Sequence, residues 1–165
     1  MDGAGETGWR SLDLLIERAG TVLASVTLAV ALVTISAQVV ARYIVGDSII
    51  WAEELARYAL IWSAMIGAAV AYRRGAHVAV GVLWGVLPEA GVRFVWRAIH
   101  LIVVAFAAVV LWQGLALVLR NFARHQLSPA LQVEIGWAYL AIPCGGALLA
   151  LAAIEGIWLA RRPSK

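Results

Sequence analysis

Residues 19–41 read AGTVLASVTLAVALVTISAQVVA, a stretch of 23 residues without a charged side chain. A helix of that length extends about 34 Å at about 1.5 Å per residue, and the hydrocarbon core of a bilayer is about 30 Å thick. The stretch therefore predicts a helix that crosses a membrane.

Three further apolar stretches follow at residues 58–72, 98–119 and 135–154. Apolar residues make up 63% of the chain and charged residues 14%, against roughly a half and a quarter in globular proteins. The second stretch reaches spanning length if its helix begins near Ile50. The sequence predicts an all-α integral membrane protein, and no room remains for a soluble domain. The predicted spans are about 20–41, 50–72, 96–119 and 134–158, within a membrane domain of residues 20–160.

The distribution of Lys and Arg predicts the orientation. Nine of them lie in the N-terminal segment, the middle loop and the C-terminal tail, and four lie on the first and third loops. Because cationic loops stay in the cytoplasm, we expect both termini inside and the first and third loops outside. Residues 1–19 form a polar tail and an amphipathic helix, which lies on the inner surface or extends the first span. Residues 161–165 form a cytoplasmic tail.

The centres of the predicted spans are almost free of ionisable side chains. A transporter that moves ions or anions by itself usually carries buried carboxylates, arginines or broken helices there. With the predicted topology, His77, His100 and His125 do not share one side of the membrane, so they cannot converge on one metal ion. We therefore expect no cofactor, no metal, no nucleic-acid partner and no enzymatic activity.

Small residues recur along one face of each of the first two spans. They are Gly20, Ala24, Thr27, Ala31, Thr34 and Gln38 in the first span, and Ala59, Ser63, Gly67, Ala71 and Gly75 in the second. Such faces let helices approach closely in lipid. They serve either packing within the chain or the docking of a separate membrane protein.

Two segments resemble a known family. Residues 51–78 read WAEELARYALIWSAMIGAAVAYRRGAHV. This resembles the W-x-E-E-x-x-R-x-x-x-x-W…G-A…R-x-G-x-H-[IV] pattern of the small membrane subunit of tripartite ATP-independent periplasmic (TRAP) transporters, the DctQ-like permeases. Residues 127–145, LSPALQVEIGWAYLAIPCG, look like the second recurring region of that family. Gly81 departs from the pattern, because an acidic residue usually follows the His-Val pair.

The resemblance implies a scaffold subunit in the cytoplasmic (inner) membrane of a bacterium or archaeon. Such a subunit braces a large membrane subunit that carries the substrate and sodium sites. The system also uses a periplasmic substrate-binding protein and imports organic acids, mainly carboxylates, with an ion gradient. Membrane lipids are the remaining expected partners. The candidate partner-contact or structural residues are Trp51, Glu54, Arg57, Trp62, Gly67, Gly75, His77, Tyr139, Pro143 and Gly145.

Several of these residues have two interpretations. Glu53 and Arg57 either pair with each other at the outer end of the second span, or Glu54 or Arg57 binds the large subunit or the binding protein. His77, with Arg73 and Arg74, either meets anionic lipid or fixes the middle loop against the large subunit.

We expect Pro143 to kink the fourth span and Gly67 to mark a close contact. Two other functions stay open for the chain as a whole. One is a self-sufficient small four-helix transporter acting as a homo-oligomer, although the first span lacks the buried Glu that such exporters need. The other is the membrane anchor of a redox complex.

Overall fold

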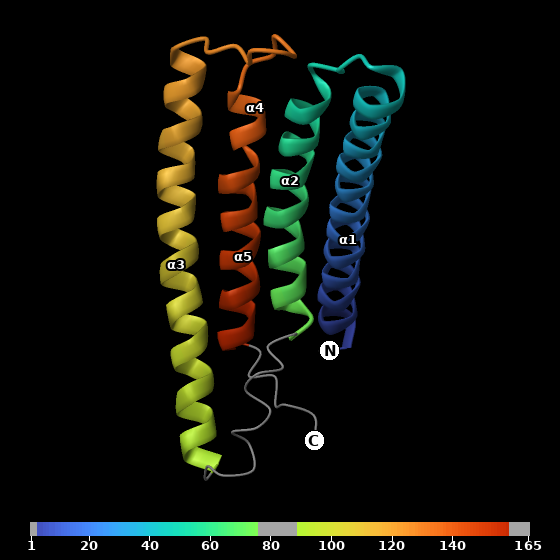
Figure 1. Ribbon diagram of the computed structural model, residues 1–165. Helices are drawn as coiled ribbons and strands as arrows, with labels where there is room; N and C mark the ends of the chain where they lie inside the picture. Colours follow the sequence, from blue (N-terminus) through green and yellow to red (C-terminus); the bar gives the residue numbers. More distant parts are fainter. Residues whose placement is uncertain (1–2, 76–88, 159–165) are drawn as a thin grey trace.

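The apolar segments form long helices in the computed structural model, which describes residues 3–75 and 89–158. Four of its helical segments are long and apolar enough to cross a membrane (Figure 1). The prediction of an all-helical protein with four spans is confirmed. The elements are α1 (Gly3–Val40), the π-helical turn η1 (Ala41–Val45), α2 (Ala52–Arg73), α3 (Glu89–Ala123), α4 (Gly136–Tyr139) and α5 (Ala141–Trp158).

The N-terminal helix is continuous with the first span. α1 runs unbroken from Gly3, so the amphipathic segment extends the first span rather than forming a helix of its own. The hydroxyls of Thr21, Thr27 and Thr34 each donate to the backbone carbonyl four residues earlier, at 2.7 to 2.9 Å. These bonds matter in lipid, because no water is present to satisfy a polar group. Thr side chains are therefore compatible with a span here.

The four spans lie in an open row rather than a closed bundle. α1 packs on α2, α2 packs on α5, and α5 packs on α3. Over the described residues, α1 makes no comparable contact with α5 or α3. The same order is seen across Figure 1. α1 and α3 therefore form the two edges of the row, and α2 and α5 form its middle.

The small-residue face of α1 meets α2, and Ala59 and Ser63 are the members of the small-residue face of α2 that contact it. A side chain at Gly20 would collide with Val70, and the Ser63 hydroxyl donates to the carbonyl of Ala24 at 2.9 Å. Farther along, Ala31 packs with Ala56 and Ala59. Close backbone approach of this kind stabilises helix pairs in lipid through dispersion and short polar contacts. The α1 face is thus used for packing within the chain.

Glycines also set the spacing in the other half of the row. A Cβ at Gly145 would lie 2.7 Å from the Cβ of Met65 on α2. On the other side of the same helix, a Cβ at Gly146 would lie 3.1 Å from the backbone nitrogen of Leu111 on α3. Adjacent glycines therefore let α5 approach α2 and α3 at once.

The fourth span is divided at a turn. Leu140 separates α4 from α5, and Pro143 lies in the first turn of α5. Proline lacks an N–H and its ring excludes the carbonyl four residues back, so it fits the first turn of a helix and not its interior. Pro143 packs against Gly114 of α3, where a Cβ would lie 3.0 Å from the proline nitrogen.

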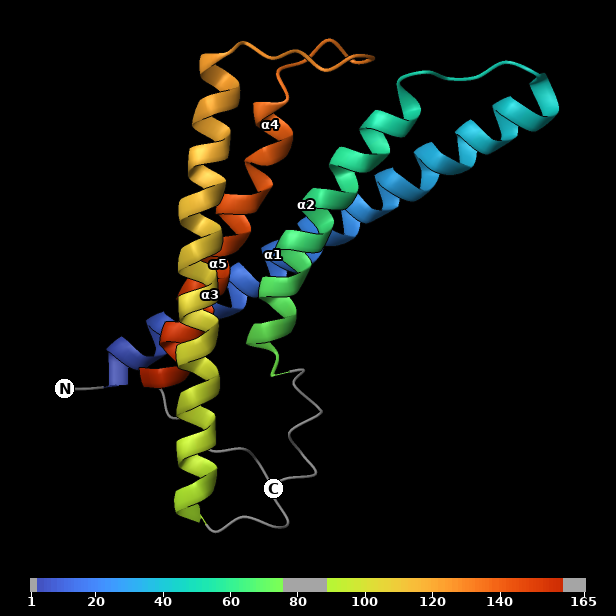
Figure 2. The same ribbon diagram turned by 60° about the vertical axis from the view of Figure 1, so that its left-hand side comes forward.

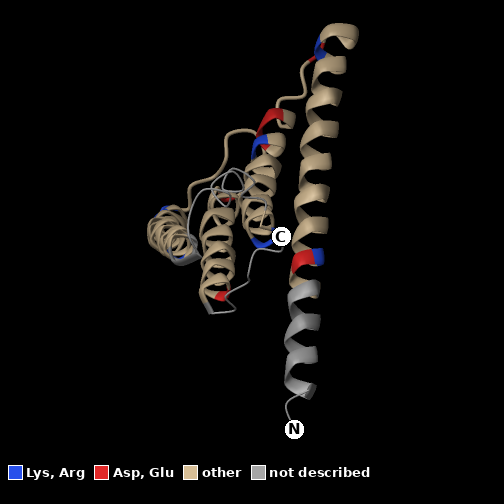
Figure 3. Cartoon of the chain, turned by 90° about the horizontal axis from the view of Figure 1, so that it is seen from below, with Lys and Arg blue, Asp and Glu red and all other residues tan. Residues whose placement is uncertain are grey.

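The row is also twisted. Figure 2 shows α1 and α2 inclined to α3, and Figure 3 shows α3 nearly end-on while α1 is seen along its length. The charged side chains of the described residues gather toward the helix ends, with long uncharged stretches between them (Figure 3). The edge helices expose many large apolar side chains to their surroundings, among them Leu32, Val33, Phe106 and Trp112. Such apolar surfaces are suited to contact with lipid tails.

A matched pair of glycines tests this packing. Gly145→Ala places a methyl group against the Met65 backbone and forces α2 and α5 apart, which should cost about 1 to 3 kcal/mol. Gly67→Ala is the control, because a Cβ there meets nothing within 4 Å. Thermal unfolding of the detergent-solubilised chain should show a lower midpoint for Gly145→Ala only. Equal midpoints for the two variants would contradict the packing described.

Candidate functional site

Glu54 joins the N-terminal end of α2 to a distant loop. The two ends of the row are called outer and inner here after the orientation that the sequence predicts. Its side chain is only 8% exposed. One carboxylate oxygen accepts hydrogen bonds from the backbone N–H groups of Ala130 at 2.9 Å and Leu131 at 3.0 Å. The other oxygen accepts from the hydroxyl of Tyr58, one turn along α2. Burial of a charge requires such partners, and Glu54 obtains three of them.

The segment that Glu54 binds, residues 124–135, is called here the outer loop. It crosses the end of the row from α3 toward α2 before it returns to α4 (Figure 1). The backbone N–H of Ser128 donates to Val133 at 2.8 Å, and that of Ile135 donates to Gln126 at 3.0 Å. Ser128 is fully buried. The loop is therefore a folded unit with its own hydrogen bonds.

Two residues of the outer loop have a left-handed backbone. His125 has φ of 46° and Gln132 has φ of 55°, which is uncommon for residues other than glycine. The Gln132 carboxamide donates to the carbonyls of Ser128 and Pro129, at 3.1 and 2.9 Å. Such conformations persist where the surroundings over-determine them. The hydrogen bonds of Glu54 and Gln132 supply that constraint near Gln132, and the backbone N–H of His125 donates to the carbonyl of Phe122 at 3.0 Å.

A second polar contact closes the turn between α1 and α2. The Gln38 side chain is buried, and its oxygen accepts from the backbone N–H of Ile49 at 2.9 Å. Its nitrogen donates to the Ser48 hydroxyl at 3.4 Å. Gly46 permits the turn through its φ of 80°. The outer end of the α1–α2 pair is thereby fixed by one amide side chain.

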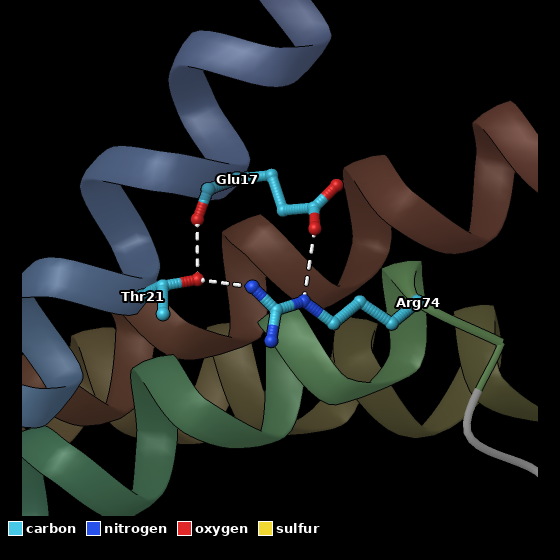
Figure 4. A network of polar contacts seen from close by, with 3 residues as sticks. All are labelled: Glu17, Thr21 and Arg74. Carbon is cyan, nitrogen blue, oxygen red and sulfur yellow. Dashed lines mark hydrogen bonds and ion pairs between the residues drawn. The ribbon is translucent and has the colours of Figure 1, made fainter.

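At the inner end, adjacent arginines connect α2 to both neighbours. Arg73 pairs with Glu155 of α5 at 3.1 Å. Arg74 pairs with Glu17 of α1 at 2.9 Å and donates to the Thr21 hydroxyl at 2.8 Å (Figure 4). Partly exposed pairs contribute at most about 1 kcal/mol each. Their main effect is therefore to set the register of α2 between its neighbours.

A buried aromatic cluster joins α2 and α3 near the same end. The Tyr72 hydroxyl shares a hydrogen bond with Nδ1 of His100. The rings of Tyr72 and Trp96 both meet the imidazole edge-to-face, with centroids 5.7 and 5.1 Å away. Gly156 of α5 gives the imidazole its space, since a Cβ there would collide with the ring. His100 of α3 therefore contacts both α2 and α5.

The candidates at the outer end of α2 fall into two groups. Trp51 and Arg57 are exposed, whereas Glu54 is buried. The predicted Glu53–Arg57 pair is not formed, because Arg57 takes part in no ion pair with any described residue. Both side chains extend outward instead, where the gain from pairing is small. The alternative in which Glu54 binds a partner subunit is not favoured, because its carboxylate is bonded within the chain.

The remaining candidates are spread through the fold. Trp62 and Tyr139 are half-buried, and Pro143 and Gly145 are buried between helices. Gly75 ends α2 with φ of 67°. Gly67 makes no close contact within the described chain, so a close approach there requires another molecule. His77 lies outside the described residues, as do Gly81 and Pro88.

Among the side chains that the structure describes, no group of three or more His, Cys, Asp or Glu residues is arranged to hold a metal ion. Sequence reasoning missed the contacts of Glu17, Gln38 and Glu155. Their positions near span ends were visible, but their partners depend on which helices are neighbours. Arg73 and Arg74, with His77, were expected to meet anionic lipid or to fix the middle loop against the large subunit. Both arginines pair with carboxylates of neighbouring helices.

These features define a multi-pass membrane protein with its ionic contacts at the helix ends and an open row of spans. The chain belongs to the DctQ component family of the tripartite ATP-independent periplasmic transporters, whose family profile matches residues 15–162. It is accordingly a multi-pass protein of the inner membrane.

Individual relatives agree with this assignment. A putative TRAP transporter small permease protein of Haemophilus influenzae is 32% identical over 143 residues, 85% of this chain and 86% of that protein. The C4-dicarboxylate TRAP transporter small permease protein DctQ of Rhodobacter capsulatus is 34% identical over 110 residues, 63% of this chain and 46% of its own length. The isethionate TRAP transporter permease protein DctMQ of Oleidesulfovibrio alaskensis is 30% identical over 108 residues, 66% of this chain. The matched part is 17% of that longer protein.

Neighbouring glutamates test the role assigned to Glu54. Glu54→Gln removes the charge that strengthens the hydrogen bonds from Ala130 and Leu131 and makes the Tyr58 hydroxyl an acceptor, which should destabilise the chain by about 1 kcal/mol. Glu53→Gln should change stability by less than about 0.5 kcal/mol, because Glu53 is exposed. Thermal unfolding in detergent measures both. Equal effects from the two variants would show that the carboxylate of Glu54 does not hold the loop.

Proposed function

We propose that this chain is the small permease subunit of a TRAP-type importer and that it braces a separate large permease subunit. The observation that carries the proposal is the open row. Four spans in a row leave broad faces uncovered, whereas a closed bundle would turn those faces inward. A scaffold gains from such faces, because they are available to a partner in the membrane.

Fused relatives support the existence of that partner. The region similar to this chain makes up 17% of the isethionate permease DctMQ and 17% of the sialic acid TRAP transporter permease protein SiaT of Haemophilus influenzae. In those proteins the rest of the permease is on the same polypeptide. For this chain, the remainder would be supplied by a separate large subunit, which would carry the transport sites.

The exposed face of α2 is the surface that we assign to the large subunit. This α2 face comprises Arg57, Leu60, Ala64, Gly67 and Ala71. Leu60 is the one residue of α2 among the strongly exposed large apolar side chains, whereas α1 and α3 expose many. Small residues favour close packing of helices in lipid, and large ones suit contact with lipid tails. Trp51 and Arg57 lie exposed at the outer end of this helix.

The substrate class that we propose is organic acids, mainly carboxylates, imported with an ion gradient. Relatives are named as small permease proteins for C4-dicarboxylates and sialic acid. Between Thr21 and Ala41, the described first span has no charged residue that would bind an anion. Substrate selection would therefore belong to the large subunit and to a periplasmic substrate-binding protein. In this arrangement both termini face the cytoplasm.

Reconstitution tests the division of labour. In liposomes, the chain alone should give no solute uptake, and the chain with the large permease and binding protein encoded beside it should give gradient-dependent uptake. Mild-detergent extracts of the native membrane should contain this chain together with the large permease. Uptake by the chain alone, or its recovery only as a lone monomer, would contradict the proposal.

A single substitution tests the α2 face. Gly67→Leu should reduce co-purification with the large subunit by about tenfold, because the added side chain blocks close helix approach. The isolated chain should keep its thermal stability, since Gly67 faces open space. Val33→Leu, on the exposed surface of α1, is the control and should leave co-purification unchanged. Unchanged co-purification of Gly67→Leu would remove the α2 face from the interface.

A further inference from the structure

One carboxamide of the spans has no hydrogen-bond partner among the described residues. Gln113 is exposed on α3, and its side chain bonds to no other described residue. The other two carboxamides of the described spans are satisfied within the chain. The Gln38 side chain bonds to the backbone N–H of Ile49 at 2.9 Å. The Asn121 side chain donates to the carbonyl of Leu117 at 2.8 Å. The Gln113 amide therefore offers a donor and an acceptor to another molecule.

This amide lies well inside the apolar part of its helix. The span in α3 covers Phe94–Ala123, and Gln113 is about 15 Å from the outer end of that span at about 1.5 Å per residue. The neighbouring Gly114 packs against Pro143, which lies inside the span Gly136–Ile157. Hydrocarbon offers no hydrogen bonds, so an unsatisfied amide is costly at this depth. The exposed amide thus indicates a protein contact at this site rather than contact with lipid tails.

Gln113 belongs to a regular stripe of side chains on α3. The stripe, called here the α3 seam, comprises Ile102, Phe106, Val109, Gln113, Ala116 and Arg120. Its spacings alternate between four and three residues, which is the repeat of helices that pair with knobs-into-holes packing. Ile102 is 69% exposed, and Phe106 and Val109 are each 60% exposed. The seam is therefore long and apolar enough to receive another helix.

The seam faces away from the neighbouring helix of the row. Ala107 and Gly114 mark the side of α3 that packs on α5, because they lie against Gly146 and Pro143. Phe106 and Gln113 each precede these contact residues by one position, a little more than a quarter turn around the helix. α3 is also an edge of the row, so no other described span packs on the seam.

The seam is complementary to a second copy of itself. A carboxamide both donates and accepts, so two Gln113 side chains that meet across a two-fold axis satisfy each other without any further group. Copies in one membrane share one orientation, so each Gln113 lies at the same depth as its counterpart. A single polar residue in an apolar seam is also a feature that fixes the register of paired helices. Arg120 repels its copy at the outer end, so the contact closes between Ile102 and Gln113.

We propose that the chain forms a parallel pair through the α3 seam, with the two Gln113 carboxamides hydrogen-bonded to each other across the two-fold axis. Gln113 sets the register, and Ile102, Phe106 and Val109 supply the apolar contact. The inference does not rest on the proposed function, because the seam lies on α3 and the surface assigned to the large subunit lies on α2. In an importer, the pair joins two complexes.

Energy transfer between labelled chains tests the pairing. Full-length chains that carry a donor or an acceptor fluorophore at the C-terminus are mixed in liposomes, and the lipid content is varied. Gln113→Leu should lower the association constant about tenfold, because it removes both hydrogen bonds and keeps an apolar surface. Leu115→Ala, at an exposed position on another side of α3, is the control and should stay within about twofold.

Two further variants separate hydrogen bonding and charge from shape. Gln113→Asn should lower the association constant by no more than about threefold, since the shorter amide keeps both a donor and an acceptor. Arg120→Leu should raise it about threefold, because like charges no longer face each other at the outer end of the seam. Thermal unfolding in detergent should give Gln113→Leu the midpoint of the unaltered chain, since the amide bonds to no described residue.

The outcomes separate this inference from the proposed function. Equal association of Gln113→Leu and the unaltered chain would overturn the pairing, and so would a lack of association of the unaltered chain at every lipid content. Loss of co-purification of Gln113→Leu with the large subunit, while the unaltered chain stays monomeric, would assign the seam to that subunit and would also overturn the pairing. Failure of the unaltered chain to co-purify with a large subunit would count against the proposed function and would leave the pairing standing.

Discussion

The packing of α2 between α1 and α5 is the constraint on which the rest of the structure depends. α1 is held by α2, and α3 is held through α5, so the two halves of the row meet mainly at the α2–α5 interface. The Tyr72–His100 bond and the bonds of Glu54 to the outer loop add contacts at its two ends. Gly145 against Met65 sets the distance at this interface. The ion pairs of Arg73 and Arg74 set the register of α2 at the inner end, and Glu54 connects it to the outer loop.

This arrangement is compatible with the proposed scaffold role, even though the chain buries few large side chains. A row of helices has few fully buried large side chains, and its described core is built mainly from alanine and glycine contacts. In lipid, exposed apolar surface carries no penalty, so the row does not need to close on itself. The uncovered faces are then available to a larger membrane protein and to a second copy of the chain.

The four spans could be predicted from the sequence, whereas the contacts between them could not. Uncharged length predicted the four spans, and the spacing of Gly20, Ala24 and Ala31 predicted a packing face on the first helix. The order of helices in the row was not predictable, because each amphipathic pattern is weak in a segment that is apolar all round. The partners of Glu54 were missed for the same reason. Two of its three hydrogen-bond donors lie 76 and 77 residues away in the chain, in a loop that only the tertiary fold brings near.

The open row itself is most directly tested by one distance. Spin labels at Leu32→Cys on α1 and Val109→Cys on α3, in a Cys144→Ala background in nanodiscs that hold one chain each, report the separation of the two edge helices by pulsed electron paramagnetic resonance. Three helix-to-helix steps of about 8 to 10 Å each predict a separation of roughly 25 Å. A narrow distribution near about 10 Å, the spacing of packed neighbours, would mean that the helices close into a bundle and would contradict the account.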